Sequence, residues 1–213
     1  MINSVIKNLE KNNIKAFYAK DKNEALEIVK TLLKDNETLS VGGSVTLAEC
    51  KITDYLRCGK FNFLDRAKEG LSNDDIQKIY RDTFFADTYL SSANAITKDG
   101  YIYEVDGNGN RVSAILFGPK QVILVVGKNK IVENCEDAVL RVKNTAAPKN
   151  ANRLSCETYC KVNGKCISLS QNEPELCDGC NSLQRICADY VFLGRQRISG
   201  RIKVILVDEN LGY

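Results

Sequence analysis

The sequence contains no histidine and no tryptophan, and it has only three prolines in 213 residues. Without histidine, neither a Ser-His-Asp nor a Cys-His catalytic arrangement can form, and no imidazole can bind a metal. Acid–base chemistry would therefore depend on Asp, Glu, Lys, Tyr or Cys. The lack of tryptophan and the few prolines also argue against an extracellular or linker-rich protein.

An excess of one charge and long apolar runs are missing as well. The 30 basic and 27 acidic residues leave a net charge of +3, which is too even to indicate a nucleic-acid partner or an anionic membrane surface. No stretch approaches the roughly 18 apolar residues of a membrane span, and residues 1–10 carry charge where a signal peptide needs an apolar block. We therefore expect a cytoplasmic protein.

Apolar patterning predicts strands that alternate with helices. Expected helices cover 2–12, 21–33, 47–56, 72–85 and 131–143, and expected strands cover 16–18, 38–41, 61–64, 88–90, 101–105, 112–117, 121–126 and 202–207. This alternation favours a three-layer α/β fold with a mostly parallel sheet. The Asp-Gly-Asn-Gly-Asn segment 106–110 predicts an antiparallel β-hairpin over 101–117. We expect a core over 1–150, a cysteine-rich insertion over 151–190, and a final strand that returns to the core within 191–213.

Nine cysteines are unusual in a chain expected to lie in a reducing compartment, where disulfides are not maintained. Six of them have the spacing C-x3-C-x5-C-x10-C-x2-C-x6-C; they are Cys156, Cys160, Cys166, Cys177, Cys180 and Cys187. Thiolates bind both zinc and iron–sulfur clusters, and four suffice for either. Only one C-x2-C knuckle is present, which favours a cluster over a zinc ribbon, although zinc and metal-free thiols stay open. The scattered Cys50, Cys58 and Cys135 are expected to be ordinary buried thiols.

Two glycine loops are candidate sites for an anionic ligand. Gly42, Gly43 and Ser44 lie between a predicted strand and a predicted helix, where backbone N–H groups can face an anion. The second loop, 106–110, has more residues that tolerate positive φ than a hairpin needs, and the positive charge of Arg111 follows it. Its candidate ligand-binding residues are Gly107, Asn108, Gly109, Asn110 and Arg111. The alternative is an irregular hairpin with a surface arginine.

Three further residues complete the candidate site. Asp106 and Glu104 are the candidate catalytic bases in a chain without histidine. Asn94 follows the expected strand 88–90, at the end where α/β folds place ligand groups.

Several short segments, in this order along the chain, resemble the LUD-domain family of the lactate utilisation protein C type. They are 42–47 (GGSVTL), 94–97 (NAIT), 106–112 (DGNGNRV), 127–132 (GKNKIV), 146–151 (AAPKNA), 185–187 (RIC) and 209–213 (ENLGY). The resemblance implies a Rossmann-like three-layer sandwich, similar to the sugar-phosphate isomerase and CoA-transferase superfamily. It also implies a role in bacterial lactate utilisation, beside iron–sulfur redox partner proteins.

The resemblance also suggests which cysteines bind metal. Short LUD proteins carry a C-x5-C pair, then Cys-Asn-Ser, then Arg-Ile-Cys, and Cys160, Cys166, Cys180 and Cys187 match these positions. Cys177 is an alternative to Cys166. The implied cofactor is a [4Fe–4S] cluster.

Three functions follow from these observations. The first is a LUD-type redox protein with this cluster and a small carboxylate or phosphorylated ligand at the glycine loops. The second is an isomerase- or transferase-like enzyme with structural zinc, in which Asp106 or Glu104 is the base. The third is a non-enzymatic sensor of metal or redox state.

Overall fold

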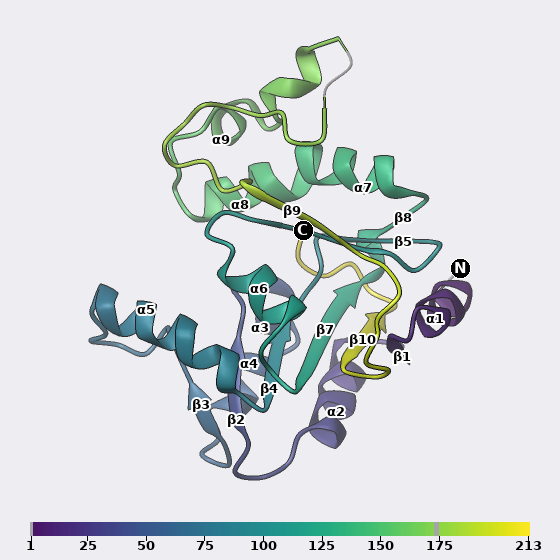
Figure 1. The fold of residues 1–213 in the computed structure, drawn as a ribbon, viewed down its shortest axis with the longest axis vertical. Helices are drawn as coiled ribbons and strands as arrows, with labels where there is room; N and C mark the ends of the chain where they lie inside the picture. Colours follow the sequence, from purple (N-terminus) through teal and green to yellow (C-terminus); the bar gives the residue numbers. More distant parts are fainter. Residues whose placement is uncertain (1, 173–174) are drawn as a thin grey trace.

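A wholly parallel six-stranded sheet forms the centre of the computed structural model, which describes residues 2–172 and 175–213 (Figure 1). In sheet order its strands are β1 (Lys15–Ala19), β10 (Ile202–Val207), β7 (Gln121–Gly127), β4 (Thr88–Ser91), β2 (Thr38–Val41) and β3 (Asn62–Leu64). The expected strands 38–41 and 202–207 have the predicted bounds. The predicted α/β class with a mostly parallel sheet is confirmed.

Both faces of this sheet are buried, because successive side chains of a strand point to opposite faces. In β7, Val122, Leu124 and Val126 enter one core cluster, whereas Ile123 and Val125 enter another. The second cluster is covered by α2 (Lys22–Leu32), α3 (Val45–Glu49) and α4 (Ile52–Leu56). Such continuous apolar runs are typical of central parallel strands.

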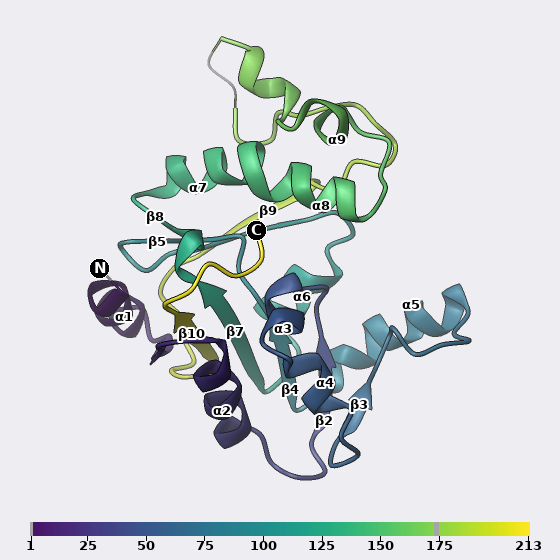
Figure 2. The same ribbon diagram turned by 180° about the vertical axis from the view of Figure 1, so that it is seen from behind.

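A second, four-stranded sheet lies over the opposite face (Figures 1 and 2). Its order is β8 (Ile131–Val132), β5 (Ala95–Thr97), β6 (Ile102–Asp106) and β9 (Asp189–Leu193). Its inner side shares a core with α1 (Ile2–Lys11) and α6 (Asn110–Leu116). Its outer side packs against α7 (Cys135–Arg141) and the π-helical turn η3 (Val142–Ala146), and η3 continues into α8 (Ala147–Arg153).

Capping residues explain where several helices begin. The Asp21 carboxylate accepts the N–H groups of the first turn of α2, and Ser72 and Asp75 form a capping box at α5 (Asn73–Asp82). The expected helix 47–56 is divided into α3 and α4, because Lys51 has a left-handed backbone with φ 54°. Short turns complete these elements: η1 (Thr83–Phe85) after α5 and η2 (Lys128–Lys130) after β7.

The hairpin expected over 101–117 is wrong in its position. Residues 110–116 form α6, and β6 pairs with β5 in an antiparallel hairpin that turns at 98–101. The glycines belong to a strand-to-helix turn: a Cβ at Gly107 would lie 3.1 Å from Ile186 Cα, and Gly109 has φ 70°. The helix expected over 131–143 also begins later, since residues 131–132 form β8 and Asn134 caps α7.

The cysteine-rich segment follows α8 and leads into β9. It contains the short helix α9 (Tyr159–Asn163) and the turn η4 (Ile167–Ser170). Glu173 and Pro174, within this expected insertion, lie outside the described residues. Helix α8 crosses residue 150 and strand β9 crosses residue 190, the two predicted segment boundaries. No helix among the described residues is both long enough and apolar enough to span a bilayer.

Candidate functional site

A cleft of about 470 Å³ opens beyond the carboxyl ends of β2 and β4. Its walls come from the loops after β2, β4 and β6, from α8, from residues 183–186 and from the C-terminal residues 212–213. The predicted residues among its lining are Gly43, Ser44, Asn94, Asp106, Gly107, Asn108, Asn110 and Arg111. The structure therefore brings residues of both glycine loops to one cavity.

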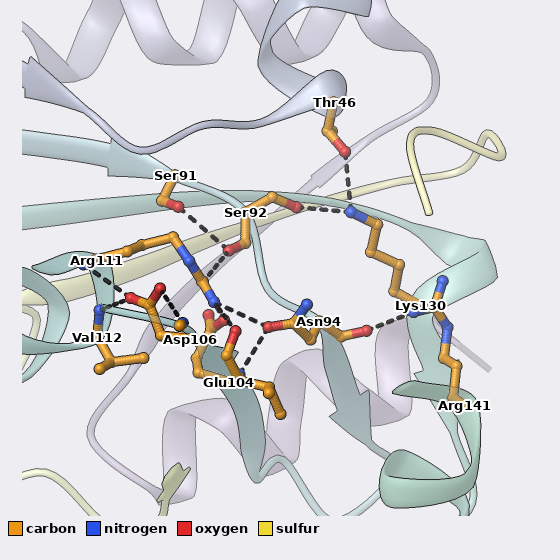
Figure 3. Close-up of polar contacts among 12 residues, drawn as sticks. Thr46, Ser91, Ser92, Asn94, Glu104, Asp106, Arg111, Val112, Lys130 and Arg141 are labelled. Carbon is orange, nitrogen blue, oxygen red and sulfur yellow. Dashed lines mark hydrogen bonds and ion pairs between the residues drawn. The ribbon is translucent and has the colours of Figure 1, made fainter. Parts of the chain in front are cut away.

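Arg111 is held rigidly at the floor of the cleft (Figure 3). Its guanidinium donates to Asn94 Oδ1 at 3.0 Å, to the Val105 carbonyl at 2.7 Å, and to the Glu104 carboxylate. Asn94 Oδ1 also accepts the Val105 N–H at 2.8 Å. Asn94 thus positions Arg111, and four of the guanidinium's five N–H groups are already used, counting the one to the Ser92 carbonyl.

Glu104 has no solvent exposure, and it does not line the cleft. Burial raises the pKa of Glu104, while the neighbouring Arg111 opposes this shift. Its second oxygen, Oε1, has no hydrogen-bond partner among the described residues. These contacts are those of a buried partner for Arg111 rather than of a base that meets a ligand directly.

Asp106 caps the start of α6. Its two oxygens accept the N–H groups of Gly107 at 2.8 Å, Arg111 at 2.9 Å and Val112 at 3.0 Å (Figure 3). The backbone N–H groups of the candidate ligand-binding residues Gly107 and Arg111 therefore already bind a carboxylate of the chain itself.

The first glycine loop is tightly packed. The Gly42 N–H donates to the Leu90 carbonyl at 2.9 Å, and Ser44 Oγ accepts the Leu47 N–H as the cap of α3. A Cβ at Gly42 would lie 2.7 Å from Ser91 Oγ and 3.1 Å from Arg111 Cδ. Gly42 therefore allows a close approach of Arg111 and is not itself among the residues that line the cleft.

Four cations that were not predicted as site residues also line the cleft; these are Arg66, Lys130, Arg153 and Arg185. Among the described residues, none of the four forms an ion pair, and Asp106 is the one acidic residue in the lining. A Cβ at Gly43 would lie 2.6 Å from an Arg66 guanidinium nitrogen and 3.8 Å from one of Arg153. The cleft is therefore strongly electropositive. Arg66 and Arg153 could not be predicted because they lie outside any recognised motif and converge only in the fold.

Lys130 is the most deeply buried of these cations, with 3 % of its surface exposed. Its Nζ donates to Thr46 Oγ1 and to Ser92 Oγ, both at 3.0 Å (Figure 3). Burial, with the nearby Arg141 guanidinium, lowers the pKa of Lys130 to about 7. A lysine of this kind is partly neutral near physiological pH.

Four cysteines line a second, apolar cavity beside the cleft. They are Cys160, Cys166, Cys180 and Cys187, and the wall is completed by side chains that include Tyr103 and Ile167. Burial and the neighbouring thiols raise the pKa of Cys160. Cys177 is exposed and is not part of this lining. Among residues 2–172 and 175–213, no three Cys, Asp or Glu side chains converge as ligands of a single metal ion would.

The other cysteines lie elsewhere. Cys156 lines the cleft rather than the cysteine cavity. Cys50 is buried as expected, but Cys58 is exposed and Cys135 is half-buried, so the expectation of three buried thiols is correct for Cys50 alone.

Arg185 lies between the cleft and the cysteine cavity. It lines the cleft, and its guanidinium donates to the carbonyl oxygens of Cys187 at 2.8 Å, Cys180 at 3.2 Å and Cys177 at 2.6 Å. The two cavities also share wall residues, Val142 and Ala147. The cleft and the cysteine cavity are therefore direct neighbours.

Comparisons with known proteins agree with this fold. A crystal structure of a DUF162 family protein from Deinococcus radiodurans is similar over 97 % of this chain and 95 % of that chain, with a TM-score of 0.53 and 14 % sequence identity. At that identity the likeness concerns the fold. A search of curated proteins found no match. The family model described as the LUD domain matches residues 2–207, so the chain belongs to the LUD domain family.

Proposed function

We propose that this LUD-domain protein serves redox metabolism of the lactate-utilisation type, with a [4Fe–4S] cluster on the cysteine cavity and a small carboxylate or phosphorylated ligand in the cleft. The observation that carries the proposal is the shared wall: four thiols line one cavity next to a cation-lined cleft. An electron carrier beside a metabolite site is the arrangement that such a function requires. Electrons would pass onward to iron–sulfur partner proteins.

The donor chemistry of the cavity fits a cluster. Cys160, Cys166, Cys180 and Cys187 supply four thiols in apolar surroundings, the ligand number of a [4Fe–4S] cluster. The preference for a cluster over zinc comes from the cysteine spacing, which has a single C-x2-C knuckle. The free space is small, about 20 Å³, so loading a cluster requires the segment to open.

The cleft offers guanidinium groups for an anion. Arg66 and Arg153 both lie over Gly43. Arg66 is oriented by a hydrogen bond of 2.7 Å to the Tyr80 hydroxyl, and Arg153 by one of 2.7 Å to the Tyr213 hydroxyl. Planar guanidinium forks match carboxylate and phosphate oxygens. The ligand site of this proposal is therefore the arginine pair, with the glycine loops as its support.

Metal analysis of protein purified without oxygen tests the cluster. We expect about four irons and as many sulfides per chain, with broad visible absorption. Cys180→Ser should lose most of this iron, whereas Cys177→Ser, three residues away but outside the cavity, should retain it. About one zinc per chain, or equal iron loss in both variants, would contradict the cluster assignment.

Titration calorimetry with inorganic phosphate and with L-lactate tests the cleft. Arg66→Met and Arg153→Met should each weaken binding by about tenfold or more, since a hydrogen bond to a charged group contributes about 1.5–3 kcal/mol. Arg57→Met, outside the lining residues, is the matched control. If neither anion binds the unmodified protein, the ligand part of the proposal is wrong.

A further inference from the structure

Lys130 has an arrangement that stability alone does not explain. A buried ammonium is costly unless a carboxylate neutralises it, and Lys130 forms no ion pair within the described part of the chain. Its partners are the neutral hydroxyls of Thr46 and Ser92. The nearby Glu104 is already paired with Arg111. The surroundings of Lys130 therefore favour an uncharged amine.

The hydroxyl partners suit an amine in either protonation state. Both hydroxyls can accept a hydrogen bond from an ammonium, and the Ser92 hydroxyl can instead donate one to an amine lone pair. Thr46 Oγ1 also lies 3.4 Å from the Leu211 carbonyl, to which it donates. Ser92 comes from the loop after β4, and Thr46 comes from α3, so two separate elements fix the position of Nζ.

Lys130 also belongs to the wall of the proposed ligand site. Lys130 lines the same cleft as Arg66 and Arg153. The C-terminal segment closes over it: a Cβ at Gly212 would lie 3.3 Å from Lys130 Nζ. A nucleophilic lysine needs a desolvated, partly neutral amine and a substrate held within reach. The low pKa of Lys130, about 7, agrees with this geometry.

We propose that Lys130 is a nucleophile that forms an imine with a ketone or aldehyde whose carboxylate or phosphate group is bound by the cleft arginines. Nζ forms a bond to the carbonyl carbon, and the carbonyl oxygen leaves as water with the two protons that the amine gives up. The adjacent Ser92 hydroxyl can pass a proton between nitrogen and oxygen. No oxidant or reductant is needed for this step. The inference rests on the anion site of the proposed function and adds a chemical class of substrate to it.

Reductive trapping tests the imine. The full chain is incubated with sodium cyanoborohydride and either pyruvate or dihydroxyacetone phosphate, and the products are identified by intact mass and peptide mapping. We expect one adduct, on Lys130, with at least one of the two compounds; the compound that reacts identifies the anionic group. Absence of a Lys130 adduct with both, or equal labelling of surface lysines, would overturn the proposal.

Two variants make the result specific. Lys130→Met should lose the adduct, whereas Lys128→Met, in the same short turn η2 but paired with Asp208 at the surface, should retain it. Circular dichroism checks that both variants fold. Binding of phosphate and of L-lactate is measured in parallel: binding of either without an adduct contradicts only the imine, whereas an adduct with binding of neither contradicts only the arginine site.

Discussion

Arg111 and Glu104 form an ion pair that is almost completely removed from solvent. The side chain of Arg111 is 14 % exposed and that of Glu104 is 0 % exposed. Both lie at the junction of β6 and α6, where the chain turns from the second sheet into the helix. The pair therefore connects the cleft floor to the core of the protein.

Arg111→Met should lower the free energy of unfolding by about 3–5 kcal/mol, because a buried carboxylate then loses its partner. Urea denaturation measures this loss. The control is Arg57→Met, which breaks the more exposed pair with Asp65 and should cost about 1 kcal/mol or less. If the free energy of unfolding fell by similar amounts in the two variants, the buried pair would contribute no more to stability than the exposed one.

Neighbouring glycines of the first loop should differ sharply in their tolerance of a methyl group. Gly42→Ala places Cβ 2.7 Å from Ser91 Oγ and 2.9 Å from the Tyr89 hydroxyl oxygen, both of buried residues, and should destabilise by about 1–3 kcal/mol. Gly43→Ala meets only the flexible end of Arg66 at 2.6 Å. Thermal unfolding should show a clear loss for Gly42→Ala and little change for Gly43→Ala. The opposite order would contradict the packing described here.

The stability of the protein should rise with pH through Lys130. Its folded pKa is about 7, against an ordinary value of 10.5. Between these values the unfolded lysine binds a proton that the folded one does not, so raising the pH favours the folded state. Between pH 7 and pH 9 the gain is about 2 kcal/mol.

Urea denaturation of the wild type and of Lys130→Met at both pH values isolates this effect, since titrations of other groups cancel in the difference. The charged groups that influence Lys130 are Arg141, Glu104, Arg111 and Glu49, and all of them remain in the variant. A pH dependence that is the same in both proteins would show that Lys130 keeps its ordinary pKa when folded.

Arg185→Lys should reduce the metal content of the cysteine cavity. The substitution keeps the positive charge but removes the planar fork that holds the carbonyl oxygens of Cys177, Cys180 and Cys187. Iron per chain after anaerobic purification, and the rate of proteolysis in the segment, measure the effect. Arg195→Lys is the control, because Arg195 donates to the carbonyl of Lys11 rather than to the carbonyl of a cysteine. If both variants contained the same amount of iron per chain, Arg185 would not be needed to position the cysteine segment.

The sequence predicted the parallel strands well, because a strand buried on both faces reads as an uninterrupted apolar run. Residues 121–126 and 202–207 are of this kind. The prediction of a hairpin over 101–117 was wrong because Asp106 and the glycines after it are compatible with both a hairpin turn and a strand-to-helix turn. The choice depends on Asp189 and Ile186, which pack against the turn from far along the chain.

The site was predictable where its residues are close in sequence or, like Asn94, follow an expected strand. The two glycine loops and the cysteine group were identified in this way. Arg66 and Arg153 were not predicted, since a basic residue outside any motif gives no sign in the sequence of which other residues it will meet. Lys130 lies in the quoted segment 127–132, but its burial is visible only in the folded protein. The meeting of these cations is a property of the tertiary structure.

The π-helical turn η3 and the start of α8 separate the cleft from the cysteine cavity, with Val142 and Ala147 bordering both. A π turn holds an extra residue in the helix, and such turns are frequent at functional sites. One layer of side chains borders both cavities. A substitution in this layer that changes the volume of one cavity therefore changes the volume of the other as well. Engineering a new ligand preference into this protein therefore means redesigning both cavities together.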